Sequence, residues 1–176
     1  MILFILWESG SGKTTLEHAL VNQYWFKMFD KYSTRPPRWG DDKSGYHHIT
    51  VSDMLARWAT GELDECIKYN GEFYGMAIPW WNMPDEKYVA VVTESWFQQF
   101  IDMGIYNEHD VYSIFLINKN CEEWMRNRWD SEENISERMF LNTIMRIYSW
   151  SHNTIPADGW SEAVLELIKL YYPELF

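Results

Sequence analysis

The chain has 176 residues, which is long enough for a single domain with a hydrophobic core. Hydrophobic residues make up 47% of it and charged residues 23%, as in ordinary globular proteins. The formal net charge of −11 argues against binding to long nucleic acids, because such binding needs a cationic surface. The charge leaves room for a mononucleotide held by a local basic cluster. No apolar run approaches the length of a transmembrane helix, so we expect no membrane association.

The first apolar run, Ile2 to Trp7, predicts a strand that is covered on both faces. The run is too short for a secretory signal and lacks the cationic start of one. The two cysteines, Cys66 and Cys121, have no paired spacing. We therefore expect free thiols in a reducing compartment and a cytoplasmic location.

A glycine-rich turn follows this strand. Residues 9–15 read Ser-Gly-Ser-Gly-Lys-Thr-Thr, and residues 13–26 predict a helix. Gly10 and Gly12 allow the backbone to curl so that several N–H groups point at one anion. The positive end of the following helix adds to that field. Strand, turn and helix in this order form most of a phosphate-binding loop.

The next residues of the loop fit the binding of a nucleoside triphosphate. Lys13 can reach the β- and γ-phosphates, and the Thr14 hydroxyl can bind Mg²⁺. Two residues depart from the full pattern. Trp7 stands where the pattern has glycine, and Glu8 brings a carboxylate close to the phosphates.

Residues 33–78 interrupt the alternation of strands and helices. A proline- and arginine-rich loop comes first, then a strand over 46–51 and a short helix through Gly61 that Ser52 can cap. Asn70-Gly71 between two strand-like runs predicts a hairpin. We expect a small α+β insertion at the carboxyl ends of the parallel strands, where ligands bind.

Strands and helices alternate again after the insertion. The predicted strands are 88–93 and 111–117, and the predicted helices are 95–103, 120–129, 132–150 and 160–171. This order predicts an α/β fold with a parallel sheet flanked by helices. We expect one domain over residues 1–176, whose core is 1–32 and 79–176 and whose insertion is 33–78.

The insertion contains a second group of basic residues. Arg35 and Arg38 lie three residues apart on a segment stiffened by two prolines. Guanidinium groups match phosphate oxygens in a bidentate manner. The hydroxyl groups of Tyr46 and Tyr74 could add donors. Beside a phosphate-binding loop, this group indicates a site for an acceptor monophosphate.

Taken together, these segments resemble the guanylate kinases, which are nucleoside monophosphate kinases of the P-loop class. The similarity covers nearly the whole chain, and the order of the segments is more specific than any one of them. They are Ser9-Gly10-Ser11-Gly12-Lys13-Thr14-Thr15, Ser33-Thr34-Arg35-Pro36-Pro37-Arg38, Gly45-Tyr46, Gly61-Glu62-Leu63-Asp64-Glu65, Gly71-Glu72-Phe73-Tyr74-Gly75 and Arg126-Asn127-Arg128 before Asp130-Ser131-Glu132-Glu133.

The resemblance implies a role for each matching residue. Glu65 would accept the two adjacent N–H donors of guanine, and Glu94 falls near the acidic position that also contacts the base. A lid over about 126–138 would carry three arginines. The implied catalytic residues are Lys13, Arg126, Arg128 and Arg138. The implied ATP-binding residues are Ser9, Gly10, Ser11, Gly12, Lys13, Thr14 and Thr15, with Thr14 on the metal. The implied acceptor-binding residues are Ser33, Arg35, Arg38, Tyr46, Glu65, Tyr74, Met76 and Glu94.

One departure concerns the choice of base. Met76 stands where the family usually has a hydroxyl residue that donates to guanine O6, and a thioether cannot donate. Lys31, Tyr32 or Ser33 would have to supply the missing donor. If none does so, selection for guanine is weaker.

The sequence therefore predicts a kinase that transfers the γ-phosphoryl group of ATP to GMP or dGMP with Mg²⁺. One alternative is a phage-type deoxynucleoside monophosphate kinase with a broader choice of base, which suits the small size and the divergence. A second alternative is a non-catalytic binding module of the same family, against which Lys13, Thr14 and the lid arginines argue. The expected partners are ATP and a nucleoside monophosphate, and the expected state is a monomer or a homodimer.

Overall fold

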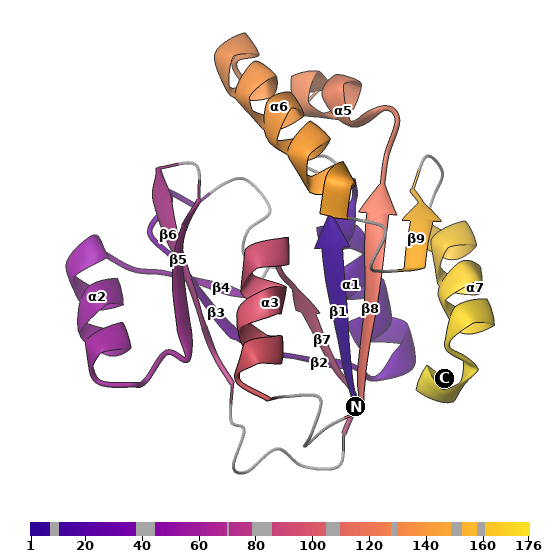
Figure 1. The fold of residues 1–176 in the computed structure, drawn as a ribbon, viewed down its shortest axis with the longest axis horizontal. Coiled ribbons are helices and arrows are strands. Elements are labelled where there is room, and N and C mark those ends of the chain that lie inside the picture. Colours follow the sequence, from indigo (N-terminus) through magenta and orange to yellow (C-terminus); the bar gives the residue numbers. More distant parts are fainter. Residues whose placement is uncertain are drawn as a thin grey trace. The chain divides into compact units, whose positions relative to one another are not determined.

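A computed structural model shows the fold of the protein (Figure 1). It describes residues 1–7, 11–37, 45–69, 71–78, 86–104, 110–127, 130–148, 153–157 and 161–176. The chain divides into two compact units. Unit 1 consists of Met1–Phe26 and Lys87–Phe176, and unit 2 consists of Lys27–Glu86. The insertion predicted over 33–78 falls within unit 2.

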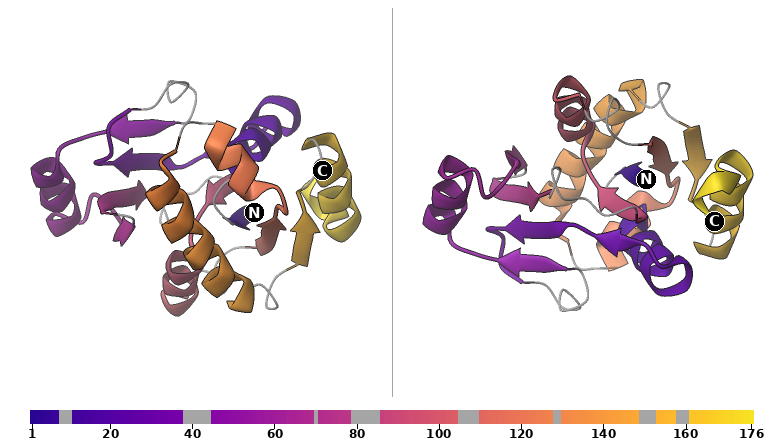
Figure 2. Two further views of the ribbon diagram at one scale, coloured as in Figure 1. Left: turned by 90° about the horizontal axis from the view of Figure 1, so that it is seen from above. Right: turned by 90° about the horizontal axis from the view of Figure 1, so that it is seen from below.

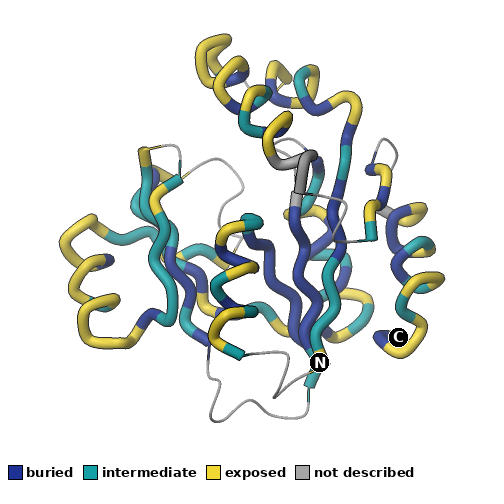
Figure 3. Tube along the Cα trace, in the orientation of Figure 1, coloured by how far each residue is buried: buried dark blue, intermediate teal, exposed yellow. Residues whose placement is uncertain are grey.

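Unit 1 contains a parallel sheet, in which neighbouring strands follow the order β7-β1-β8-β9. Its strands are β1 (Ile2–Trp7), β7 (Tyr88–Val91), β8 (Val111–Ile117) and β9 (Asn153–Pro156). Residues Ile2 to Leu6 are completely buried, as expected of a central parallel strand (Figure 3). Because all four strands are parallel, their carboxyl ends lie at one edge of the sheet.

Helices cover both faces of this sheet (Figure 2). They include α1 (Lys13–Tyr24), α3 (Glu94–Asp102) and α7 (Ser161–Tyr171), and a short 3-10 helix, Pro173–Leu175, ends the chain. Phe4 of β1 packs on α3, with ring-centroid distances of 5.4 Å to Phe97 and 5.5 Å to Phe100. Figure 2 shows α1 and α3 on opposite sides of β1.

Two further helices follow β8 in unit 1. They are α5 (Cys121–Asn127) and α6 (Glu132–Tyr148). Ser131 begins α6 as a cap, because its hydroxyl oxygen accepts the backbone N–H of Asn134 at 3.3 Å. No helix among the described ranges combines the length and the apolar character that crossing a membrane requires.

Unit 2 is built on a smaller mixed sheet with the order β4-β3-β6-β5. The helix and strands of unit 2, of which β2 is not part of this sheet, are β2 (Lys27–Met28), β3 (Asp30–Ser33), β4 (Tyr46–His48), α2 (Val51–Ala59), β5 (Glu65–Tyr69) and β6 (Glu72–Ala77). Strands β5 and β6 pair antiparallel, so the predicted hairpin is confirmed. Gly71 follows β5 with φ 82°, a conformation that glycine adopts without strain.

The helix of unit 2 begins earlier than the sequence suggested. Thr50, not Ser52, is its cap, because the Thr50 hydroxyl oxygen accepts the backbone N–H of Asp53 at 3.1 Å. The same hydroxyl donates to the Asp53 carboxylate at 2.7 Å. This reciprocal pair fixes the first turn, and the strand predicted over 46–51 therefore ends at His48.

The predicted fold class, a parallel sheet flanked by helices with a small α+β insertion, is confirmed. Three strands were not predicted, and the first of them, β2, has only two residues. β3 contains a lysine and an aspartate, and β9 is a four-residue edge strand that ends in proline. Neither has the apolar run or the strict alternation that marks a strand in a sequence.

Candidate active site

The N-terminus of α1 forms the first part of the candidate site. Gly12 caps the helix with φ 83°, and a Cβ at this position would meet no atom of the described residues within 4 Å. Space beside a left-handed glycine is what a ligand needs to approach the backbone. Ser11 is 3% exposed, and its hydroxyl has no hydrogen-bond partner among the described residues. This buried polar atom lies next to a helix terminus that favours anions.

The remaining loop residues are only partly described. Lys13 is the first residue of α1 and is half-buried, while Thr14 and Thr15 are exposed in the first turn. Ser9 and Gly10, like Glu8, lie outside the described residues. The described part therefore presents backbone N–H groups, one ammonium group and hydroxyl groups at the start of one helix.

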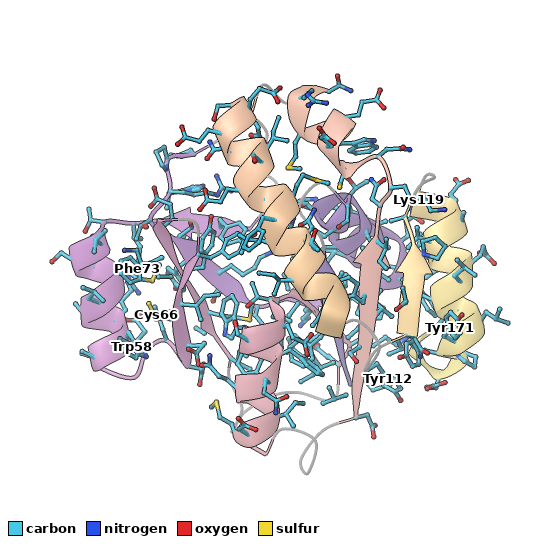
Figure 4. All side chains as sticks on the ribbon, turned by 45° about the horizontal axis from the view of Figure 1, so that its top comes forward. Trp58, Cys66, Phe73, Tyr112, Lys119 and Tyr171 are labelled. Carbon is cyan, nitrogen blue, oxygen red and sulfur yellow. The ribbon has the colours of Figure 1, made fainter. Side chains whose placement is uncertain are left out.

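Polar residues also follow the other strands of the parallel sheet. Glu94 opens α3 after β7, where Thr93 caps the helix by accepting the Trp96 N–H at 3.2 Å. Asn118 follows β8 and is 1% exposed, and its side-chain oxygen accepts the N–H of Asn120 at 2.8 Å. Lys119 is labelled beyond the end of β8 in Figure 4. These residues share the carboxyl edge of the sheet with the start of α1, the usual place for ligands in α/β proteins.

Two of the predicted lid arginines, Arg126 and Arg138, lie on α5 and α6. Arg126 is exposed and donates to two carboxylates, at 2.7 Å to Glu122 and at 3.0 Å to Glu132. The hydrogen bonds that Arg126 donates to Glu132 raise the pKa of Arg126 and lower the pKa of Glu132. Arg128 lies outside the described residues.

Arg138 has a different environment from Arg126. It is 9% exposed, and its Nη1 lies 3.7 Å from an oxygen of Asp130. Its Nε has no hydrogen-bond partner among the described residues. Arg138 therefore retains a buried donor that a ligand oxygen could accept, whereas Arg126 is already held by surface carboxylates.

The predicted acceptor residues of unit 2 fall on one face of its sheet. Residues that lie directly opposite each other on paired strands point to the same face. The register pairs Tyr46 with Lys31, Lys31 with Met76 and Met76 with Glu65, which gives one row across four strands. We call this set of four residues the base row.

A second row lies beside the base row on the same face. It consists of His48, Ser33, Tyr74 and Ile67, each paired with the next. The ring centroids of Tyr46 and Tyr74 are 6.2 Å apart, which connects the two rows. The sheet thus brings together five of the eight predicted acceptor residues: Ser33, Tyr46, Glu65, Tyr74 and Met76.

Arg35 extends from the end of β3 towards the same face. It is 9% exposed, and its guanidinium carbon lies 5.5 Å from the centre of the Tyr46 ring. The guanidinium also donates to the Pro36 carbonyl at 3.2 Å, and the Arg35 carbonyl lies 2.9 Å from His48 Nδ1. These contacts hold a cation beside the two tyrosines. Arg38, the second predicted arginine, lies outside the described residues.

A contact that the sequence did not reveal anchors the Arg35 loop to the hairpin. The Thr34 hydroxyl donates to the Glu72 carboxylate at 2.7 Å and accepts the Phe73 N–H at 2.9 Å. The backbone N–H of Thr34 also donates to the Phe73 carbonyl at 3.0 Å. Both Thr34 and Glu72 lie within the segments that carry the family resemblance, but only the fold brings them together.

Glu65 lies at the end of the base row and is half-buried. Burial raises the pKa of its carboxyl group, and the neighbouring Asp64 charge adds to the rise. The backbone N–H of Cys66, which donates to Glu65 at 3.3 Å, acts in the opposite direction. A carboxylate that is desolvated in this way gains more from hydrogen bonds with a ligand than an exposed one would.

The opposite face of the sheet packs on α2. Figure 4 labels Cys66 and Phe73 between the hairpin and this helix. A Cβ on Gly75 would lie 2.8 Å from a methyl group of Leu63 and 3.0 Å from the sulfur of Met54, so only glycine allows this contact. Tyr32 belongs to this face too, since Arg57 of α2 lies 5.2 Å from the centre of its ring. Tyr32 is therefore separated from the base row by the sheet.

Cys66 and Cys121 are free, as predicted. No cluster of three or more histidine, cysteine, aspartate or glutamate residues that could bind a metal occurs in the described part of the chain.

Comparison with known proteins agrees with this arrangement. No family model matches the chain. The guanylate kinase of Ehrlichia chaffeensis is 30% identical to it over 146 residues, which cover 79% of this chain and 69% of that protein. The chain belongs to the guanylate kinase family. The guanylate kinase of Paraburkholderia xenovorans is 28% identical over 144 residues, which cover 80% of this chain and 64% of that protein. The chain thus spans just under two thirds of the length of this second relative.

Solved structures show the same fold. The crystal structure of guanylate kinase from Anaplasma phagocytophilum matches with a TM-score of 0.72 at 20% identity, covering 100% of this chain and 86% of that chain. The structure of deoxyadenosine kinase from M. mycoides with bound dATP matches with a TM-score of 0.50 at 13% identity, covering 98% of this chain and 100% of that chain. At these identities the similarity concerns the fold alone.

Proposed function

We propose that this protein transfers the γ-phosphoryl group of ATP to GMP or dGMP and so forms the nucleoside diphosphate. The observation that carries the proposal is the face of the unit 2 sheet, where Glu65, Tyr46, Tyr74 and Arg35 gather in a chain of the guanylate kinase family. A carboxylate at one end and a guanidinium near the tyrosines suit the base and the phosphate of one nucleotide.

ATP binds at the start of α1 in this proposal. Residues Ser9 to Thr15 surround its phosphates with backbone N–H groups, and the Ser11 hydroxyl and the Lys13 ammonium add donors. Lys13 neutralises the charge that develops on the transferring group. Its contribution is electrostatic, because phosphoryl transfer needs no covalent intermediate on the protein.

The residues at the start of α1 fit a magnesium ion that is held mainly by the nucleotide. Thr14 presents an exposed hydroxyl oxygen, the ligand type that Mg²⁺ prefers. Mg²⁺ usually keeps several waters and binds substrate phosphates with one or two protein oxygens, so a full cage is not required. When bound, the ion would neutralise charge on the β- and γ-phosphates.

The acceptor nucleotide lies along the sheet face in this proposal. Glu65 accepts two N–H groups of guanine, while Arg35, Arg38, Tyr46 and Tyr74 hold the phosphate, and Ser33, Met76 and Glu94 complete the site. On the lid, Arg126, Arg128 and Arg138 close over the transferring group. Arg126 must first exchange its carboxylate partners Glu122 and Glu132 for phosphate oxygens.

A coupled assay of ATP consumption over all common ribonucleoside and deoxyribonucleoside monophosphates tests the proposal. We expect GMP or dGMP to be the best acceptor, and Glu65→Gln to lower kcat/KM for it by about 5- to 100-fold, because an amide cannot accept both N–H donors. The Glu62→Gln variant is the matched control for loss of a nearby carboxylate, because Glu62 is exposed and pairs with Arg57 of α2.

Two outcomes would replace this assignment. If dTMP, dCMP or AMP is the best acceptor of the wild-type protein, the kinase has the broader or different base choice of the phage-type alternative. If no acceptor gives turnover but a nucleotide still binds, the protein is a binding module of the same family.

A further inference from the structure

Lys31 occupies an unusual position for a lysine. It is 2% exposed, although it carries a charge, and it lies in the middle of β3. Lysine is almost never this buried without a reason, because moving an ammonium group out of water is costly. Its Nζ lies 5.0 Å from the centre of the Tyr46 ring and 3.9 Å from the sulfur of Met28.

The register of the sheet places this cation in the base row. Lys31 is paired with Met76, and Met76 is paired with Glu65, so the three side chains leave the same face in sequence. Two strand spacings, roughly 9–10 Å, separate the backbones of Lys31 and Glu65. Met76 lies between them and is completely buried. The row therefore has a cation towards one side, a carboxylate at the other and one apolar side chain between.

The other two residues that could replace the family's hydroxyl donor are less well placed. Tyr32 lies on the opposite face, against Arg57 and His47, with a centroid distance of 4.9 Å to the latter. Ser33 lies in the second row, opposite Tyr74, and its hydroxyl oxygen accepts the Arg35 N–H at 3.3 Å. Lys31 alone among the three lies in the same row as Glu65.

We propose that Lys31 determines base choice by donating a hydrogen bond to the acceptor edge of a 6-oxopurine while Glu65 accepts from its donor edge. This inference rests on the proposed function and names its recognition residue. Guanine presents O6 and N7 as adjacent acceptors, a pattern to which lysine donates readily. Adenine presents an N–H₂ donor in place of O6, which would face the donors of the ammonium group. Met76 packs against the ring and does not itself distinguish guanine from adenine.

The variant Lys31→Met tests this inference, because methionine keeps most of the apolar stem and removes only the ammonium group. We expect kcat/KM for GMP to fall by about 10- to 150-fold, the range of a hydrogen bond to a charged group. The value for AMP should stay the same or rise, so the ratio of GMP to AMP falls at least about tenfold. Lys68→Met is the matched control, since Lys68 is exposed on the α2 face beside Phe73. It should leave both values unchanged.

Base analogues test the same contact in the wild-type protein and do not depend on how the variant folds. The 6-thio analogue of GMP keeps the N–H donors that face Glu65 and weakens only the acceptor at position 6. The 7-deaza analogue removes only N7. We expect one of the two to be a clearly poorer acceptor than GMP with wild-type protein, and this penalty to vanish in Lys31→Met, as in a double-mutant cycle.

The outcomes separate this inference from the proposed function. If Lys31→Met lowers kcat/KM for GMP and AMP equally, the ammonium group serves the phosphate or the fold, and the inference is wrong although the kinase assignment stands. The inference is also wrong if the wild-type protein phosphorylates both analogues with the same kcat/KM as GMP. If wild-type protein shows no kinase activity at all, the proposed function fails and the inference falls with it.

Discussion

In the parallel sheet of unit 1 the central strand β1 is buried along both faces, whereas in the sheet of unit 2 one face packs on α2 and the other carries polar side chains. The residues of β1 from Ile2 to Leu6 have no exposed surface, and the candidate site residues Ser11 and Lys13 come only after the strand. In unit 2 the candidate site residues Lys31 and Glu65 lie within the strands.

In unit 1 the residues that stabilise the fold differ from the candidate site residues, whereas in unit 2 the same residues belong to both groups. A side chain at the end of a parallel strand can change without disturbing the core behind it. A side chain within β3, β5 or β6 is part of the sheet and of the candidate site at once. Substitutions of the candidate site residues of unit 1 should therefore affect turnover with little change in stability, and substitutions of those of unit 2 should affect acceptor binding, stability or both.

The largest expected effect is the loss of turnover in Lys13→Ala. Lys13 lies at the first position of α1, where its ammonium group can reach the phosphates of ATP. We expect kcat to fall by about 100-fold or more, because electrostatic stabilisation of the transition state is lost. The melting temperature should change little. Lys169→Ala, which removes a half-buried lysine paired with Glu166 on α7, is the control and should keep full turnover. Near-normal turnover in Lys13→Ala would mean that ATP binds elsewhere.

The next largest effect concerns Arg35 in unit 2. Replacing it with alanine removes the guanidinium group beside Tyr46, and we expect the KM for GMP to rise by about 10- to 100-fold. The KM for ATP should stay within about twofold. Arg57→Ala is the matched control, since Arg57 lies on the other face of the same sheet over Tyr32. Steady-state kinetics with each substrate varied in turn will decide, and equal effects on both KM values would contradict the assignment of Arg35 to the acceptor.

A smaller effect, on stability rather than on binding, is expected for Gly75→Ala. The added methyl group would meet Leu63 at 2.8 Å, Met54 at 3.0 Å and the backbone oxygen of Glu65 at 3.2 Å. The two side chains can move, but the backbone oxygen cannot move without disturbing β5. We expect a loss of about 1–3 kcal/mol in the free energy of unfolding, measured by denaturant titration. An unchanged midpoint would show that α2 does not pack closely on this strand in solution.

The sequence predicted most of what depends on local chemistry. Asn70-Gly71 predicted the hairpin, and the apolar runs predicted β1, β7 and β8, because each signal lies within a few neighbouring residues. It did not predict β9, whose four residues form a strand only because β8 is beside them. It named Ser52 as the cap of α2, whereas the cap is Thr50, because the hydrogen bonds between Thr50 and Asp53 form only in the folded turn.

Part of the candidate site could be predicted as well, because its motifs also lie within a few neighbouring residues. The motifs identified Glu65, Tyr46 and Tyr74 as residue types suited to a nucleotide. They left Lys31, Tyr32 and Ser33 open as donors, because consecutive strand residues alternate between faces and the sequence does not say which face is which. The pairing of Lys31 with Met76, and of Met76 with Glu65, answers that question.

The smallest expected effect is a pH-dependent gain in stability in Glu65→Gln. Burial raises the pKa of Glu65 above its ordinary value of 4.5, so the unfolded chain releases this proton more readily than the folded one. Ionisation of Glu65 therefore destabilises the fold, starting near the ordinary value and reaching its full extent above the raised one. Glutamine removes this cost. Because the side chain is only half-buried and water screens it, the gain should be on the order of 1 kcal/mol or less.

Thermal melts of Glu65→Gln and wild type at pH values from about 4 to 7 will measure this gain. We expect the variant to melt higher at pH 7, and the difference to shrink as the pH falls towards the ordinary value. The same variant should be a poor kinase with GMP, so stability and activity would change in opposite directions. A variant that is less stable than wild type at pH 7 would contradict the comparison between the two sheets. Glu65 would then stabilise the ligand-free fold through contacts of its own, rather than remain charged at a cost that the bound base offsets.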